Sequence, residues 1–328
     1  MAIQMTIIGL GQIGASIGMA LSGQGEQITR VGHDKDYGIA RKAQKLGAVD
    51  RVDINLHNSV EAAEIVLLAI PMDQIHQTLS DIANDLKEGV VVMDTSPLKE
   101  VVAGWASELL PEGRHYIGLT PVINPAYLLL TTTGLDAAKA DLFQNGMMAI
   151  VAPPRSISEA IKLAVDLTHL LGATPMFFDA VEIDSLMAAT HLLPQVMSAA
   201  LINATIDRPG WLEGRKIAGR AYAEVTDPLR RMDTSKALAS ALTLNRENTL
   251  RLIDWLMDAL ATMRSEIDQQ ERAALETRLE KATAGVELWW TQRTEANWAA
   301  EEIDLREPLP TSSDMLGRWV GLRRKPKK

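Results

Sequence analysis

The sequence predicts an α/β fold in which a doubly wound sheet is followed by an all-helical second domain. Apolar stretches suited to strands alternate with helical stretches over residues 1–179, which is typical of a parallel sheet covered on both faces. From 182 to about 303 no convincing strand appears, and apolar residues recur at helical spacing. A glycine-rich turn directly after the first apolar stretch is the third observation, because such turns open doubly wound sheets.

Each element expected in residues 1–179 follows from its local pattern. Residues 65–70 and 90–93 are continuous apolar runs, as expected of buried parallel strands. The expected strands are at 5–9, 28–33, 65–70, 90–94, 115–118, 147–152 and 172–178. The expected helices between them are at 13–23, 36–47, 73–86, 134–145 and 156–171.

The second domain is expected to span residues 180–305, with long helices at 233–266 and 269–303. These helices carry more apolar surface than a small helical domain covers alone, which indicates a homodimer. Trp289, Trp290 and Trp298 are expected to be core or dimer contacts, although a ligand-stacking role is open. Residues 306–328 form a tail with a basic end, interpreted as a solubilising segment.

Composition limits the partners of the chain. Its 328 residues include 47% apolar and 23% charged residues, with a net charge of −9. This balance argues against nucleic acid and against an anionic membrane surface. There is no cysteine, and the six histidines are scattered, so no disulfide and no metal site is expected. No stretch is expected to be long enough to cross a membrane, and the start of the chain lacks the basic region of a signal peptide, so we expect a cytoplasmic protein.

The first apolar strand runs straight into the pattern G-x-G-x-x-G at Gly9, Gly11 and Gly14. Gly9 permits the tight turn, Gly11 lets a pyrophosphate approach the backbone, and Gly14 lets the helix pack closely on the strand. The amides of the helix start, at Gln12 and Ile13, would then bind phosphate. With this strand-turn-helix context, the motif predicts a Rossmann domain that binds a dinucleotide. The competing interpretation is a glycine-rich turn in an ordinary α/β protein.

Other cofactor contacts are expected where further strands end. Asp34 lies 20 residues after Gly14, where an acid that binds the ribose hydroxyls belongs, and this favours NAD. Lys35 beside it is a cation that could accept NADP, so NADP stays open. Ile70, Pro71 and Ser96 follow two later strands, and they are expected to contact the cofactor because ligands lie beyond the carboxyl ends of such strands.

The order of these motifs resembles the prephenate and arogenate dehydrogenase family over roughly residues 5 to 265. The matching positions are the glycine turn with 16–17, Asp34, 69–71, 94–99, 116–121, Asp184, Leu192, Pro194, 220–228 and 245–247. The resemblance implies a Rossmann domain with an all-helical dimerisation domain. It also implies an NAD(P)-dependent oxidoreductase of tyrosine biosynthesis, which transfers hydride with oxidative decarboxylation of a small carboxylate substrate.

The departures from the family fall on its chemistry. Thr120 stands where the family has the histidine that takes the proton from the substrate hydroxyl. The serine that orients this histidine falls on Pro97, with Ser96 adjacent. Gln195 replaces a histidine that binds substrate. Threonine is not a general base near neutral pH, so the family mechanism is not kept residue by residue.

Replacements for the lost groups can be named. His191 is the best remaining proton acceptor, although a histidine on an apolar helix can also simply bond a neighbour. Thr120, Ser96 and Gln195 could hydrogen-bond the substrate. Arg220 or, in a shifted alignment, Arg215 could bind the substrate carboxylate, and a surface ion pair is the alternative for each.

Two other functions compete with this one. The stretch 94–97 faintly resembles a motif of the β-hydroxyacid dehydrogenases, but that family needs a lysine on the first helix of its helical domain. Residues 182–206 contain none. A non-catalytic dinucleotide-binding sensor that kept the Rossmann domain and lost the base is the second alternative, supported by the histidine missing at Thr120.

Overall fold

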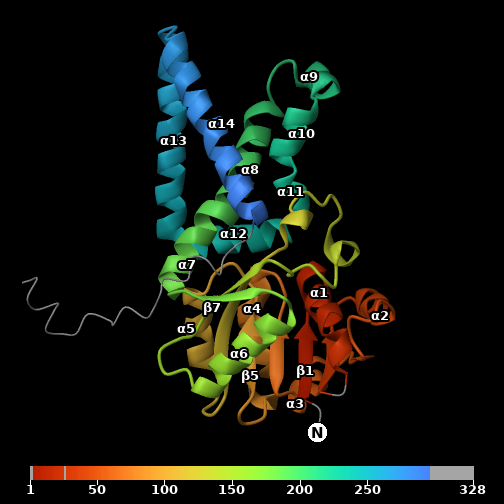
Figure 1. The fold of residues 1–328 in the computed structure, drawn as a ribbon. Coiled ribbons are helices and arrows are strands. Elements are labelled where there is room, and N and C mark those ends of the chain that lie inside the picture. The colour runs from red at the N-terminus through yellow and green to blue at the C-terminus, as the bar shows by residue number, and fades with distance from the viewer. Residues whose placement is uncertain (1–2, 26, 296–328) are drawn as a thin grey trace, which may run out of the picture.

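The computed structural model describes residues 3–25 and 27–295, and one eight-stranded sheet forms the base of the molecule (Figure 1). The strand order is β3-β2-β1-β4-β5-β6-β7-β8. The strands are β1 (Ile3–Ile8), β2 (Ile28–His33), β3 (Arg51–Val52), β4 (Ile65–Leu68), β5 (Val91–Asp94), β6 (His115–Val122), β7 (Met147–Val151) and β8 (Thr174–Phe177). The first six follow the 3-2-1-4-5-6 order of a Rossmann sheet, so the predicted α/β fold is confirmed.

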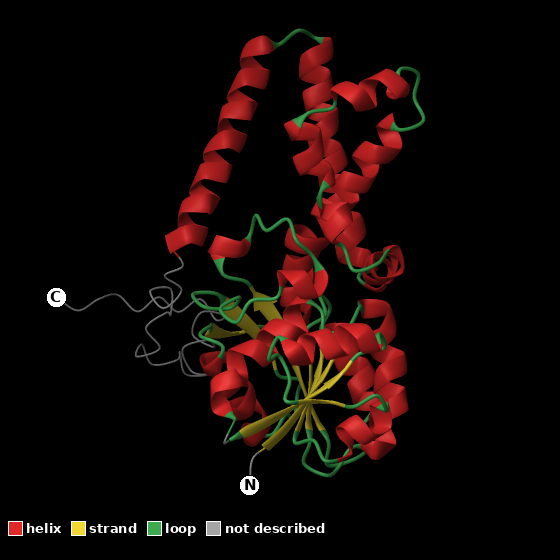
Figure 2. Cartoon of the chain, turned by 90° about the vertical axis from the view of Figure 1, so that its right-hand side faces the viewer, coloured by secondary structure: helices red, strands yellow, loops and turns green. Residues whose placement is uncertain are grey.

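Helices cover both faces of this sheet (Figure 2). They are α1 (Gln12–Ala20), α2 (Tyr37–Lys45), α3 (Leu56–Glu61), α4 (Met72–Ile82), α5 (Glu100–Leu109) and α6 (Ser158–Leu170). One apolar cluster packs α1 and α6 on one face, and a second packs α4 and α5 on the other. Two such layers are what the continuous apolar strands require, because both of their faces must be buried.

Two expectations for the sheet were wrong. The strands pair in parallel except β6 and β7, which pair antiparallel from Gly118 opposite Val151 to Val122 opposite Met147. An antiparallel pair needs no crossover helix. The helix expected at 134–145 is accordingly absent, and only a 3-10 turn at Gly134–Ala137 forms there. Strand β6 also continues to Val122, so Thr120 lies inside the strand and not after it.

Helices alone follow β8 in the described residues. They are α7 (Ala180–Met187), a π-helical turn (Ala188–Leu192), α8 (Leu193–Thr205), α9 (Trp211–Ile217), α10 (Arg220–Thr226), α11 (Pro228–Arg231), α12 (Ser235–Leu244), α13 (Arg246–Asp268) and α14 (Arg272–Glu295). The carboxyl ends of the parallel strands point toward this helical part (Figures 1 and 2). A domain boundary at 179/180 fits this order and remains our proposal.

The long helices differ in detail from the expectation. The single helix expected at 233–266 is two helices, because the chain leaves the helical conformation at Asn245, with φ −100° and ψ 43°. The helix expected at 269–303 is α14, and residues 296–303 with Trp298 lie outside the described residues, as does the tail at 306–328.

The expectation that no stretch reaches membrane-spanning length was also wrong. The run from α7 to α8, Ala180–Thr205, has 26 residues and is apolar enough to cross a membrane by length and composition. Core helices of soluble proteins share this property but are mostly buried, whereas 22% of the most apolar part of this helix is buried among the described residues. Two residues separate the run from the last strand of the sheet, and the run carries the candidate residues His191 and Gln195.

Candidate active site

The glycine turn has the geometry that its pattern predicts. Gly9 has φ +92°, and a Cβ added there would lie 2.3 Å from the carbonyl oxygen of Ala69. A Cβ at Gly14 would lie 2.0 Å from the carbonyl oxygen of Gly9. At Gly11, in contrast, an added Cβ would meet no atom of the described residues within 4 Å. The turn is therefore closed on the protein side and open on the outer side, where a ligand would approach.

The start of α1 adds hydrogen-bond donors to this opening. Gly11 is the N-cap residue of α1, and no side chain in the described part of the chain caps this helix. The first amides of a helix, here those of Gln12 and Ile13, have no partner within the helix itself. An anion such as a pyrophosphate is the natural acceptor for them, because the helix dipole also favours negative charge there.

Asp34 and Lys35 lie beside the turn at the end of β2. The Asp34 carboxylate accepts hydrogen bonds from the Leu10 amide at 2.8 Å and from the Asp36 amide at 2.9 Å, so it braces the glycine turn. Each carboxylate oxygen keeps lone pairs for further donors. Lys35 extends toward α4, with its Nζ 3.4 Å from Oε1 of Gln74.

The chain after β4 joins the sheet to the helical part. Ile70 contacts the glycine turn, with its Cγ2 2.8 Å from the position of a Cβ on Gly9. Pro71 is the N-cap residue of α4, and Asp73 in the first turn of that helix lies 3.5 Å from Nζ of Lys236. One carboxylate oxygen of Asp73, Oδ1, is buried without a hydrogen-bond partner among the described residues.

The loop after β5 is held by a buried polar network. The Asp94 carboxylate accepts hydrogen bonds from the Ser96 hydroxyl at 2.5 Å, from Lys99 Nζ at 2.8 Å and from the Tyr116 hydroxyl at 2.5 Å. Burial lowers the pKa of Lys99, which Asp94 opposes, and burial raises the pKa of Tyr116 well above its ordinary value. Ser96 is 3% exposed, and its hydroxyl also lies 3.0 Å from the Leu98 carbonyl. In this structure the Ser96 side chain therefore stabilises the loop.

Thr120 is buried below the first helix of the helical part. It is 3% exposed, and its hydroxyl has no hydrogen-bond partner among the described residues. Ala149, directly opposite on β7, packs against Ile183 of α7. Directly opposed residues of an antiparallel pair share one face of the sheet. Thr120 therefore faces α7, on the side of the sheet that also carries the Asp94 network.

His191 lies in the π-helical turn between α7 and α8. Such turns are rare and frequently mark functional sites. The side chain reaches solvent, yet protein surrounds it closely enough that desolvation lowers its pKa below the ordinary value, while the charge of Asp233 acts in the opposite direction. Burial also raises the pKa of Asp233, which His191 opposes and Asp73 reinforces. Asp233 therefore lies within electrostatic reach of both His191 and Asp73, and Asp73 follows the carboxyl end of β4.

The remaining substrate candidates are less well placed. Gln195 is buried, and its amide donates to the His191 carbonyl at 2.9 Å. Arg220 on α10 is exposed and pairs with Glu224 at 2.7 Å, and Arg215 on α9 is also exposed. Helices α9 and α10 stand away from the sheet (Figure 1), so within one chain neither arginine is brought to the glycine turn.

Sequence reasoning missed three members of this region. Tyr116 and Lys99 were quoted only as parts of motifs, although a lysine five residues after an acidic strand end was a signal for an ion pair. Asp233 was not named, since its relation to His191 joins segments far apart in the sequence.

Comparison with known proteins identifies the family. Residues 17–176 match the family model described as prephenate dehydrogenase, nucleotide-binding domain. This part of the chain is therefore a nucleotide-binding domain of the prephenate dehydrogenase family. The match confirms the resemblance seen in the motifs, to a family of NAD-dependent oxidoreductases.

Individual relatives agree with this family. A cyclohexadienyl dehydrogenase of Zymomonas mobilis is 28% identical over 200 residues, which are 60% of this chain and 66% of that protein. A prephenate dehydrogenase of Lactococcus lactis is 24% identical over 83% of this chain and 73% of that protein. The matched part of the chain thus spans about two thirds to three quarters of these curated relatives.

Solved structures of the family share the fold. Prephenate dehydrogenase from Aquifex aeolicus, in complex with hydroxyphenyl propionate and NAD+, has a TM-score of 0.75 at 16% identity, over 88% of this chain and 98% of that one. Arogenate dehydrogenase from Synechocystis has a TM-score of 0.67 at 21% identity, over 88% of this chain and the whole of that one.

Proposed function

We propose that the protein oxidises prephenate or arogenate with loss of CO2 and passes the hydride to NAD. The observation that carries the proposal is the glycine turn with its open position at Gly11, set at the edge of the sheet that points toward the helical part. His191 lies on that helical part, near the end of β4. A site of this kind holds a dinucleotide on one wall and a proton acceptor on the other.

The residues present fit a nicotinamide dinucleotide. The open backbone at Gly11 and the uncapped start of α1 suit the pyrophosphate, and Asp34 suits the ribose hydroxyls. Ile70 and Pro71 border the turn. When bound, the nicotinamide supplies the hydride acceptor.

We assign His191 as the group that accepts the proton of the substrate hydroxyl. Its lowered pKa keeps the imidazole neutral near pH 7, as an acceptor must be. As the carbon bearing the hydroxyl gives up its hydride and the ring carboxylate leaves as CO2, His191 takes the hydroxyl proton. Thr120 serves as a polar neighbour and not as a base. Gln195, Arg220 and Arg215 stay candidates for binding substrate carboxylates, the arginines only if another chain brings them to the site.

NAD is expected to bind at least about tenfold more tightly than NADP, because the Asp34 carboxylate repels a 2′-phosphate. Calorimetry with both dinucleotides measures the ratio. Asp34→Asn should reduce the preference, whereas Lys35→Ala should leave it unchanged, since Lys35 extends toward Gln74. Equal or tighter binding of NADP by the native protein would show that a cation controls the choice.

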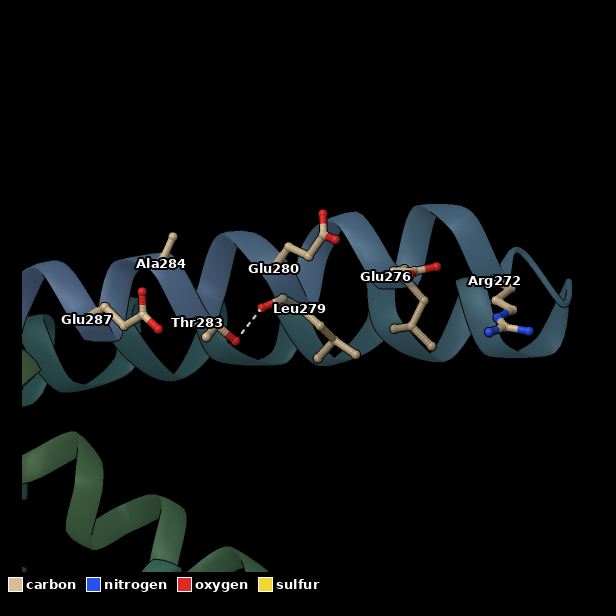
Figure 3. A pocket seen from close by; sticks show the side chains of 8 residues that line it. Arg272, Glu276, Leu279, Glu280, Thr283, Ala284 and Glu287 are labelled. Atoms are coloured by element: carbon tan, nitrogen blue, oxygen red, sulfur yellow. Dashed lines mark hydrogen bonds between the residues drawn. The ribbon is translucent and has the colours of Figure 1, made fainter.

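The helical part carries the surface expected of a homodimer. Large apolar side chains are exposed along α13 and α14, namely Leu250, Trp255, Met257, Leu260, Ile267, Leu279, Val286, Leu288 and Trp289. A shallow, open surface also runs along one face of α14, from Arg272 to Glu287, and it carries Leu279 beside several charged side chains (Figure 3). A second copy of this chain is the partner that we propose for this surface, because large apolar side chains exposed together on neighbouring helices commonly mark an interface.

Light scattering at micromolar concentration is expected to give twice the chain mass of 35.8 kDa. Replacing Trp255 and Leu260, which lie on the exposed side of α13, by glutamate should shift the mass toward that of one chain. Glutamate at Leu46, an exposed residue of the sheet domain, is the control and should leave the mass unchanged. A native protein with the mass of one chain would contradict the dimer.

The setting of the enzyme follows from its charge and its family. A net charge of −9 disfavours nucleic acid and anionic membranes as partners. We propose that the protein is cytoplasmic, which is consistent with the biosynthetic role of its relatives. Reduction of NAD in the presence of prephenate or arogenate tests the proposed activity against both the β-hydroxyacid dehydrogenase and the sensor alternatives.

A further inference from the structure

The first turn of α5 is capped by a carboxylate from the helical part. Lys99 is the N-cap residue of α5, and its own side chain makes no capping hydrogen bond. Instead, Asp184 of α7 accepts hydrogen bonds from the Lys99 amide at 2.6 Å and from the Glu100 amide at 3.1 Å. Asp184 is 4% exposed. An N-cap is normally a local side chain, so a cap supplied from 84 and 85 residues away is a contact between domains.

The capped residues belong to the loop that follows β5. While the Lys99 amide binds Asp184, its Nζ binds the Asp94 carboxylate at 2.8 Å, and both of these side chains are fully buried. Gly118 leaves the space for this lysine, because a Cβ there would lie 2.6 Å from Lys99 Cδ. The loop is therefore fixed at both ends, to the sheet through Asp94 and to the helical part through Asp184.

A third helix holds Asp184 in place. The side-chain amide of Asn245, at the break between α12 and α13, donates to the backbone carbonyl of Asp184 at 2.8 Å. Asn248 in turn donates to Oδ1 of Asn245 at 2.8 Å. The helix that carries Asp184 is continuous with the π-helical turn, so His191 lies about two turns further along the same element.

Keeping a carboxylate at this place costs stability. Burial raises the pKa of Asp184 to about 6, against the opposing effects of the two amides and of Lys99, while Glu100 adds to the rise. Asp94 and Tyr116 are the other titratable groups of this cluster. Because the pKa in the folded state lies above the ordinary value, the contribution of the group to stability is lost as the pH rises through about 6. A neutral residue of the same shape would avoid this loss.

We propose that Asp184 is a positioning residue, which fixes the helix bearing His191 against the loop after β5. The proposal rests on the proposed function, since it explains how a proton acceptor on one domain keeps its place over a dinucleotide on the other. Small displacements of a catalytic group cost much of its rate. Asp184 thus lowers stability when charged, and its proposed role is the geometry that it imposes on the helix bearing His191.

Asp184→Asn tests the proposal, with Asp179→Asn as the matched control. Asp179 caps the same helix, α7, through the Val181 amide at 2.9 Å and is exposed. For Asp184→Asn we expect kcat to fall about 10- to 100-fold, because one of two charge-assisted hydrogen bonds is lost. The dinucleotide Kd should stay within about twofold and the unfolding temperature at pH 8 should not fall, since the glycine turn is untouched and no charge is buried. Asp179→Asn should keep its kcat.

The pH dependence separates positioning from a structural role. Below about pH 6 the native carboxyl is protonated and loses acceptor capacity, so the ratio of native to Asp184→Asn turnover should shrink toward one. Protonation of His191 affects both proteins alike and cancels in this ratio. Asp184→Ala, which leaves both amides without an acceptor, should be slower still.

Three results would overturn the proposal. If native protein turns over and Asp184→Asn does so equally well, Asp184 does not position the site, although the proposed function stands. If turnover falls only in proportion to the folded fraction, or if the ratio does not change with pH, the role is structural. If native protein shows no turnover with prephenate or arogenate, the proposed function fails and this proposal fails with it.

Discussion

Gly11→Val is expected to abolish dinucleotide binding while the protein stays folded. An added Cβ at Gly11 meets no protein atom within 4 Å, so the valine side chain occupies only the space that the pyrophosphate needs. Overlap of this kind should weaken binding at least about 100-fold. Titration calorimetry with NAD measures the affinity, and thermal unfolding measures the stability of the variant.

Gly14→Ala is the matched control for this experiment. Its Cβ would lie 2.0 Å from the Gly9 carbonyl oxygen, so this variant should lose stability as well as binding. Together the two variants distinguish a substitution on the open side of the turn, which should affect binding alone, from one on its packed side, which should also affect stability. If Gly11→Val bound NAD with native affinity, the dinucleotide would not bind at this turn.

His191→Asn is expected to lower turnover by about two to four orders of magnitude, the usual effect of losing a general base. Dinucleotide affinity should remain, because His191 lies on the helical part and not at the glycine turn. In the native enzyme kcat/KM should fall as the pH drops through the pKa of His191, which burial places below the ordinary value of about 6.5. In His191→Asn, kcat/KM should not show this fall at acidic pH.

His57→Asn provides the control for the histidine experiment. His57 lies on α3, where its Nδ1 is 2.6 Å from a carboxylate oxygen of Asp85, and it takes no part in the proposed site. Its replacement should leave turnover unchanged. Native turnover in His191→Asn would place the proton acceptor elsewhere, with Thr120 acting through a water as the next candidate.

Local signals were sufficient for the glycine turn and the central strands of the sheet. The glycine turn, the apolar strands and the position of Asp34 were all predicted correctly, because each depends on residues within one strand-turn-helix unit. The helix expected at 134–145 failed, since β7 turns back antiparallel to β6 and only the pairing partner decides this direction. The break at Asn245 was also not predictable, because its side chain bonds the Asp184 carbonyl 61 residues away.

The candidate site also has a part that local sequence patterns predict and a part that depends on contacts between distant segments. The residues of the proposed cofactor wall were named from their spacing, since they follow successive strands. The network of Asp94, Lys99 and Tyr116 joins two strands and a loop, and it fixes side chains that sequence alone leaves free to bind a ligand. Ser96 is the clearest case, because its hydroxyl is committed to Asp94.

The assay that tests the central claim most directly is reduction of NAD by the purified native protein, followed by the absorbance of the reduced nicotinamide, with prephenate and arogenate supplied separately. Small β-hydroxy acids serve as comparison substrates. The proposed function predicts NAD reduction, with release of CO2 in equal amount, from prephenate or arogenate and none from the β-hydroxy acids. Tight NAD binding without reduction by any of these substrates would contradict it and would favour a non-catalytic dinucleotide sensor.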